Sequence, residues 1–175
     1  MNDFAQDTFF EQIIPIRKNG KGIAAFFGIW ILAFILCVVI FLVGFAFLGS
    51  LSLLLIFGII FGAYKLSSML NVEYEYIITN GTMDIDKITN RSSRKRMLSF
   101  ELSGVSKIEK FNPNAPSNPK TIVMACNADD ENAYLMVAER EGKGNVELVF
   151  SPDDRIKSAV KKFVLKYISN SAFKD

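Results

Sequence analysis

The chain has 175 residues, half of them hydrophobic, and a formal net charge of only +2. Nucleic-acid-binding domains usually carry a strongly basic face, so this near-neutral composition argues against nucleic acid as a partner. The chain has no histidine, which excludes catalytic triads and zinc sites that use an imidazole from this chain. We therefore expect no catalytic residue, no metal site and no cofactor. Cys37 and Cys126 lie in different parts of the chain, and we expect no disulfide between them.

Residues 1–21 form an amphipathic N-terminal segment. Its apolar residues recur at near-helical spacing and stop at Pro15, which ends or kinks a helix; they are Phe9, Phe10, Ile13 and Ile14. Three basic residues follow. The pattern predicts a short helix in the membrane interface, and a frayed terminus is the alternative.

Residues 22–66 are predicted to form a transmembrane hairpin. No charged residue occurs from Gly22 to Tyr64. About 20 apolar residues cross a bilayer, so the run is long enough for two crossings and too long for a signal peptide. The stretch from Gly44 to Ser52 is its only part rich in Gly and Ser, which mark turns. We expect helices near Gly22–Val43 and Leu48–Leu66.

The charges that flank this hairpin predict its orientation. Basic residues lie on the side of the two outer ends, and the connecting turn has none; they are Arg17, Lys18, Lys21 and Lys65. By the positive-inside rule, both termini are cytoplasmic and the protein is a multi-pass protein of the plasma (inner) membrane.

Each predicted helix has two small residues four positions apart. These are Ala24 and Gly28 in the first helix, and Gly58 and Gly62 in the second. Small residues at this spacing let membrane helices approach closely. Packing within the hairpin is the interpretation we favour, and self-association is the alternative.

The rest of the chain, residues 71–175, is predicted to be one small β-domain with a C-terminal helix. Alternating apolar residues predict seven antiparallel strands: Val72–Thr79, Thr82–Thr89, Lys95–Leu102, Val105–Phe111, Thr121–Asn127, Ala133–Glu139 and Asn145–Phe150. Asn80 and Gly81 indicate a type I′ turn, in which both residues have positive φ. That turn places Glu75 opposite Asp86, a pair of like charges. After Ser151, expected as the N-cap, an apolar stripe from Ile156 to Tyr167 predicts one amphipathic helix.

Seven strands followed by one helix resemble a pleckstrin-homology-like domain, so the predicted fold is an α+β membrane protein. Several local motifs also resemble an uncharacterised family of bacterial two-helix membrane proteins. They are Asp7-x-Phe9-x-Glu11-Gln12-Ile13, Glu73-Tyr74-Glu75-Tyr76, Thr79-Asn80-Gly81, Asp84-Ile85-Asp86-Lys87-Ile88 and Arg94-Lys95-Arg96. The resemblance implies a membrane hairpin that tethers a pleckstrin-like domain to the inner face of the membrane. It implies no activity.

The basic run Arg91, Arg94, Lys95 and Arg96 has two leading interpretations. It either orients the domain on anionic lipid headgroups, where each charge contributes about 1 kcal/mol, or it neutralises acidic residues on the outer face of the sheet. Asp84 and Asp86 point to one face of a strand, and we interpret them as a solvated face rather than a catalytic pair.

Taken together, these features predict a non-enzymatic, membrane-tethered binding or scaffold module. As an integral protein it would contact membrane lipid, and its ligand would be anionic lipid headgroups or a protein partner. The alternative is an oligomeric structural protein that assembles through its helices or sheet edges.

Overall fold

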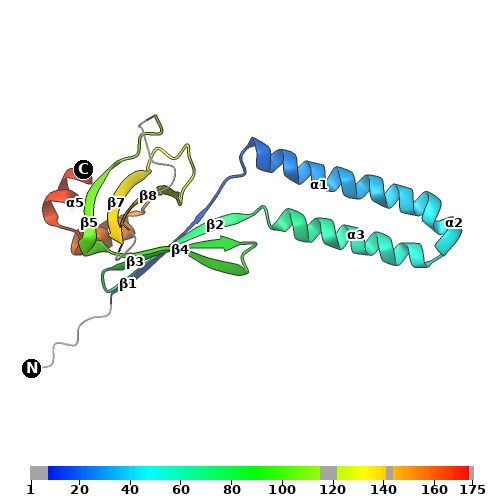
Figure 1. Ribbon diagram of the computed structural model, residues 1–175, viewed down its shortest axis with the longest axis horizontal. Helices are drawn as coiled ribbons and strands as arrows, with labels where there is room; N and C mark the ends of the chain where they lie inside the picture. The colour runs from blue at the N-terminus through cyan, green and yellow to red at the C-terminus, as the bar shows by residue number, and fades with distance from the viewer. Residues whose placement is uncertain (1–7, 115–121, 141–143, 174–175) are drawn as a thin grey trace, which may run out of the picture. The chain divides into compact units, whose positions relative to one another are not determined.

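The computed structural model describes residues 8–114, 122–140 and 144–173. The chain folds as two compact units (Figure 1). The β-domain contains the N-terminal residues up to Ile16, residues 73–88 and the chain from Ser93 onward. The helical hairpin contains residues 17–72, together with the short connection 89–92. The hairpin therefore interrupts the β-domain instead of preceding it.

The helical hairpin consists of two long helices joined at Gly49. Helix α1 (Gly20–Val39) begins at Asn19, whose side chain accepts a hydrogen bond of 2.8 Å from the Gly22 N–H. It continues through the π-helical turn η1 (Ile40–Gly44) and helix α2 (Phe45–Leu48), and helix α3 (Leu51–Ser68) follows the turn. Gly49 has a φ of 54°, which favours glycine. The turn lies within the predicted Gly44–Ser52 stretch, but Leu48 ends the first arm rather than beginning the second.

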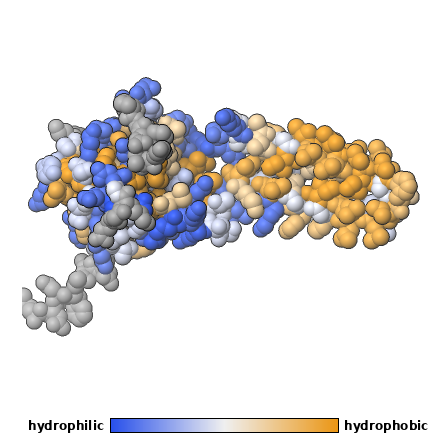
Figure 2. Space-filling model, in the orientation of Figure 1, coloured by the Kyte–Doolittle hydropathy of each residue, from blue (hydrophilic) through white to orange (hydrophobic). Residues whose placement is uncertain are grey.

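Small side chains line the contact between the two arms. Ala33, Ala63 and Ser52 are buried, and a Cβ at Gly44 would lie 3.6 Å from that of Ser52. The remaining surface is almost entirely apolar and exposed (Figure 2), and Phe47 is 84% exposed. The stretches Gly20–Leu48 and Leu51–Ser68 are long and apolar enough to cross a membrane.

The N-terminal segment is a strand, so the prediction of a short interfacial helix is wrong. Strand β1 (Phe9–Pro15) pairs antiparallel with β2 (Val72–Thr79), from Phe9 opposite Thr79 to Pro15 opposite Glu73. Phe10, Gln12 and Ile14 are half-buried, and the residues between them are exposed. This period of two is typical of a half-buried strand. Residues 1–7 of the predicted segment lie outside the described residues.

The β-domain contains eight described strands in two sheets, one more than predicted. The first sheet has the order β1-β2-β3-β4, with β3 at Thr82–Thr89 and β4 at Ser93–Glu101. The 3-10 turn η2 (Leu102–Gly104) leads to the second sheet, of order β5-β7-β8-β6. Its strands are β5 (Val105–Lys110), β6 (Ile122–Met124), β7 (Tyr134–Arg140) and β8 (Gly144–Phe150). The pairing of β6 with β8 is parallel, so the prediction of an all-antiparallel set is wrong at this strand. Thr121, the predicted start of that strand, lies outside the described residues.

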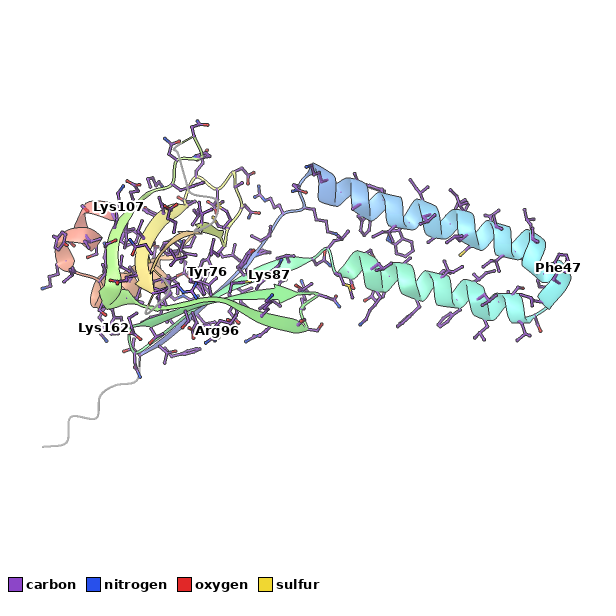
Figure 3. All side chains as sticks on the ribbon, viewed as in Figure 1. Phe47, Tyr76, Lys87, Arg96, Lys107 and Lys162 are labelled. Carbon is purple, nitrogen blue, oxygen red and sulfur yellow. The ribbon has the colours of Figure 1, made fainter. Side chains whose placement is uncertain are left out.

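The two sheets enclose the main hydrophobic core, and a smaller cluster forms around Cys126, Ala133 and Val149. Tyr76 lies between the two sheets (Figure 3) and is fully buried. Its hydroxyl donates a hydrogen bond of 2.6 Å to the Ala125 carbonyl and accepts one of 3.2 Å from the Ser151 N–H. Burial raises the pKa of the Tyr76 phenol, so it stays protonated and able to donate. This hydroxyl joins the first sheet to two segments that flank the second.

The C-terminal helix is broken into two. Helix α4 (Asp154–Phe163) is capped by Asp153, whose carboxylate accepts from the Ile156 N–H at 2.8 Å, so the N-cap is not Ser151 as predicted. Val164 is extended and buried, and helix α5 (Lys166–Ala172) follows. The break lets both Val164 and Ile168 reach the core. It leaves Tyr167, which the helical stripe placed on the buried face, 72% exposed.

Candidate functional site

The basic run of the first sheet is engaged by acidic residues of the same sheet. A nitrogen of the Arg94 guanidinium lies 3.0 Å from a carboxylate oxygen of Glu75. Arg96 contacts two carboxylates, at 2.8 Å for Asp84 and 2.9 Å for Asp86. Figure 3 shows Arg96 on the face of the first sheet that is turned away from the second, which we call the outer face. The contacts therefore tie β4, an edge strand, to β3 and β2.

Glu75 is the most unusual of these acidic residues, because its side chain is fully shielded from solvent. Burial raises the pKa of its carboxyl above the usual 4.5. The carboxylates of Glu11 and Asp86 raise the pKa further, and the positive charge of Arg94 lowers it. The hydrogen bond from Arg96 to Asp86 in turn raises the pKa of the Arg96 guanidinium. The outer face is thus a mixed-charge network rather than a uniformly basic surface.

These contacts divide the predicted lipid-facing patch. Arg94 and Arg96 make the contacts that the charge-neutralising interpretation predicts, and half of their side-chain surface remains exposed. Lys95 is exposed, and Arg91 belongs to the short connection 89–92, with a φ of 53°. The four residues therefore do not act as four equivalent free charges.

The predicted turn residues join β2 to β3. Asn80 and Gly81 have φ values of 50° and 91°, the left-handed region that a type I′ turn requires. The Asn80 side chain accepts a hydrogen bond of 3.0 Å from the Thr8 N–H. A Cβ at Gly81 would lie 3.2 Å from the ring of Phe163 in α4. The turn thus serves packing within the β-domain.

The four predicted helix-packing residues lie outside the contact between the two arms, and the interpretation that they pack the hairpin is wrong. Ala24, Gly28 and Gly58 are exposed and Gly62 is half-buried. A Cβ at any of the three glycines would meet nothing within 4 Å. The contact uses other small residues, Ala33, Gly44, Ser52 and Ala63, because these fall on the face of each helix that meets the other.

A shallow cleft of about 520 Å³ opens where β4 passes into η2. Its lining consists of Thr82, Ser99, Phe100, Glu101, Ser103, Gly104 and Glu139. The Thr82 hydroxyl donates to the Glu101 carboxylate at 2.7 Å. Within the described residues there is no group of three or more acidic or sulfur ligands that could hold a metal ion. Burial raises the pKa of the Cys126 thiol to about 12, which keeps it protonated and unreactive.

A second basic surface, which the sequence analysis did not single out, lies where α4 meets α5. The rings of Tyr134 and Phe173 pack with centroids 4.9 Å apart. The ammonium groups of Lys110 and Lys157 lie 4.7 Å and 6.0 Å from the Tyr134 centroid. The row of lysines along the helix is visible in the sequence, but their gathering around two rings depends on Tyr134 of β7 and on the bend that brings Phe173 beside it.

Two sheets of strands with C-terminal helices define a pleckstrin-homology-like domain, here carrying an inserted apolar hairpin. A family model described as a bacterial PH-like domain (DUF6106) matches residues 6–169, and the chain belongs to that family. The matched range includes β1 and the whole hairpin. No curated protein and no solved structure matches the chain.

Proposed function

We propose that this protein is a membrane-tethered, non-enzymatic binding module whose hairpin spans the plasma (inner) membrane with both termini in the cytoplasm. The observation that carries the proposal is the outer surface of the hairpin. Large apolar side chains on it are mostly exposed, as at Phe34, Phe47 and Phe57, which are 69%, 84% and 69% exposed. Such a surface is stable in lipid and unstable in water.

The orientation is tested by thiol labelling. Single cysteines at Ser50, in the turn, and at Ser171, in α5, are introduced into a chain with Cys37→Ala and Cys126→Ala. Intact cells are treated with an impermeant thiol reagent. We expect labelling at Ser50 and protection at Ser171 until the cells are opened. Labelling at Ser171 with protection at Ser50 would reverse the orientation, and extraction of the protein by alkaline carbonate would refute membrane insertion.

The outer-face contacts support a protein partner over anionic lipid as the ligand of the β-domain. Arg94 and Arg96 already contact acidic side chains, which reduces the attraction of this face to an anionic surface. The same face exposes the apolar residues Phe9 and Ile13, at 61% and 46%. Mixed charge around exposed apolar side chains is typical of protein interfaces.

Lipid binding is tested with vesicles. The protein in neutral nanodiscs is mixed with anionic liposomes, alongside a variant with Gln at Arg91, Arg94, Lys95 and Arg96. We expect the two proteins to bind the liposomes alike. If the wild-type protein binds the liposomes in a salt-sensitive way and the variant does not, these four residues contact lipid.

Self-association through the hairpin is a second candidate function. The observation that favours it is the outward position of Gly58 and Gly62, which leaves a surface with no side chain to prevent close approach of another helix. Gly58→Leu with Gly62→Leu should lower the dimer fraction in neutral nanodiscs or detergent, as measured by single-molecule photobleaching. If the wild-type protein and the variant are both monomeric, self-association through the hairpin is refuted.

A further inference from the structure

The junction of α4 and α5 carries a surface with the composition of a binding site. We call it the elbow surface; it consists of Lys110, Lys157, Lys161, Leu165, Lys166 and Tyr167. It includes residues from β5, from α4 and from the first turn of α5. No residue of the first sheet contributes to it. It is therefore separate from the mixed-charge network of the outer face.

Three of the four lysines of the elbow surface lie near aromatic rings. Lys110 and Lys157 lie over Tyr134, and the Lys161 ammonium lies 5.9 Å from the Phe173 centroid. Ammonium groups are attracted to the faces of aromatic rings. Both rings are buried, at 9% and 5% exposure, so their positions are set by the core. The charges are consequently less free to move than those of ordinary surface lysines.

The elbow surface has an excess of positive charge. Lys157 contacts Asp154 at 3.5 Å, and that carboxylate is almost fully exposed. Within residues 8–114, 122–140 and 144–173, no ion pair is recorded for Lys110, Lys161 or Lys166. On the outer face, by contrast, Arg94 and Arg96 contact carboxylates that are largely shielded. The elbow surface is thus the more strongly cationic of the two.

Two large apolar side chains that flank Lys166 in the chain are exposed. Because the chain is extended at Val164 and Leu165, Val164 turns into the core and Leu165 remains 53% exposed. Tyr167 is 72% exposed. An exposed tyrosine near charged groups is a typical anchor residue of protein interfaces.

The elbow lies at one end of the first sheet. Phe163, the last residue of α4, contacts the turn at Gly81, and Lys162 donates a hydrogen bond of 3.1 Å to the Thr8 hydroxyl. The chain leaves the β-domain for the hairpin after Ile16 and returns to it at Glu73. Pro15 and Glu73 face each other at the other end of the β1–β2 pair. The seven residue pairs between these ends span about 20 Å.

We propose that the elbow surface binds a protein segment in which acidic residues alternate with apolar ones. Charge complementarity favours acidic side chains, and Leu165 and Tyr167 require apolar groups opposite them. A single phosphate group is less suited, because the surface has no arginine fork. Nucleic acid is less suited because Tyr134 and Phe173 are buried, which leaves Tyr167 as the one exposed ring of this surface for stacking on bases. The inference rests on the proposed binding function and adds a second binding surface, separate from the outer face, with a stated partner class.

The test is a selection from a displayed library of random 12-residue peptides. The full chain, in nanodiscs of phosphatidylcholine, is the target. We expect the enriched peptides to be rich in Asp and Glu beside Leu or Phe. Lys161→Gln with Lys166→Gln should weaken their binding about 5- to 10-fold at low salt, and Tyr167→Ser by about 10-fold. The matched control removes the same charge elsewhere, with Lys87→Gln and Lys107→Gln, and should leave the affinity unchanged.

The remaining outcomes would each contradict a particular part of the proposal. Enriched peptides that lack acidic residues, or that bind the elbow variants and the control alike, would overturn the elbow surface and leave the binding function intact. A selection without any enriched peptide would refute both. If the protein binds anionic liposomes and the elbow variants alone lose that binding, the partner is a lipid surface and not a protein.

Discussion

The guanidinium of Arg94 lies 3.0 Å from the carboxylate of Glu75, with the arginine 58% exposed and the glutamate fully shielded. The pair is therefore asymmetric. Arg94 can regain water if its partner is removed. Glu75 cannot, because its side chain is shielded from solvent. Glu11 and Asp86 also add negative charge around it. The consequences of mutation should differ on the two sides of this contact.

Arg94→Gln should destabilise the β-domain, because it leaves a shielded carboxylate without its cation. We expect a loss of about 1–3 kcal/mol in the free energy of unfolding. Lys95→Gln, one position along the same strand, should change stability by less than about 0.5 kcal/mol. Chemical denaturation in one detergent compares them. Equal midpoints for the two variants would show that the contact contributes nothing.

Glu75→Gln should make stability less dependent on pH. Because the folded-state pKa of Glu75 is raised above 4.5, the folded protein favours the protonated form. The stabilisation from this group is fully present below 4.5 and is lost as pH rises through the raised value. The difference in melting temperature, variant minus wild type, should therefore become larger from pH 4 to pH 8. A difference that stays constant or shrinks over this range would contradict the raised pKa.

Gly81→Val should destabilise the domain by about 1 kcal/mol or more, because a β-branched residue is strained at positive φ. Its Cβ would also press on Phe163 at 3.2 Å. Gly104→Ala is the matched control, since a Cβ there meets only the Glu139 carbonyl at an ordinary 3.6 Å. In thermal melts, the melting temperature of Gly81→Val should be well below that of Gly104→Ala. The reverse order would reject the type I′ turn.

Tyr76→Phe should cost about 1–3 kcal/mol, because the Ala125 carbonyl and the Ser151 N–H would both lose a partner inside the core. Tyr134→Phe removes a hydroxyl for which no hydrogen bond is recorded among the described residues, and it keeps the ring contacts. Its effect should stay within about 0.5 kcal/mol. Near-equal denaturation midpoints for the two variants would indicate that water replaces the Tyr76 hydroxyl.

The β-strands with alternating apolar residues were predictable because each one shows its period of two locally. Strand β1 was not, since its inward positions include Gln12, which interrupts the apolar alternation. That side chain reaches the Ser151 carbonyl and the Asp153 N–H, at 3.1 Å and 2.9 Å. The pairing partner of β1 also lies beyond the entire hairpin. No local pattern can indicate such a contact.

The outer-face contacts were only partly predictable. The like charges of Glu75 and Asp86 and the nearby basic run indicated a need for neutralisation. Strict alternation, however, places Arg96 on the same face as the buried Leu98 and Phe100. Arg96 nevertheless reaches Asp84 and Asp86 from the edge strand. A side chain as long as that of arginine can reach partners from more than one position on a strand. The sequence pattern alone therefore did not predict which acidic residues the arginines contact.

The insertion of the hairpin between β1 and β2 imposes an order on folding. During synthesis β1 emerges before either apolar helix, and its partner β2 emerges only after both. The first sheet therefore cannot close until the complete hairpin has been made, and β1 remains without its strand partner in the meantime. Contacts between residues so distant in sequence form late and slowly. The β-domain can therefore be completed only after the whole hairpin has been synthesised.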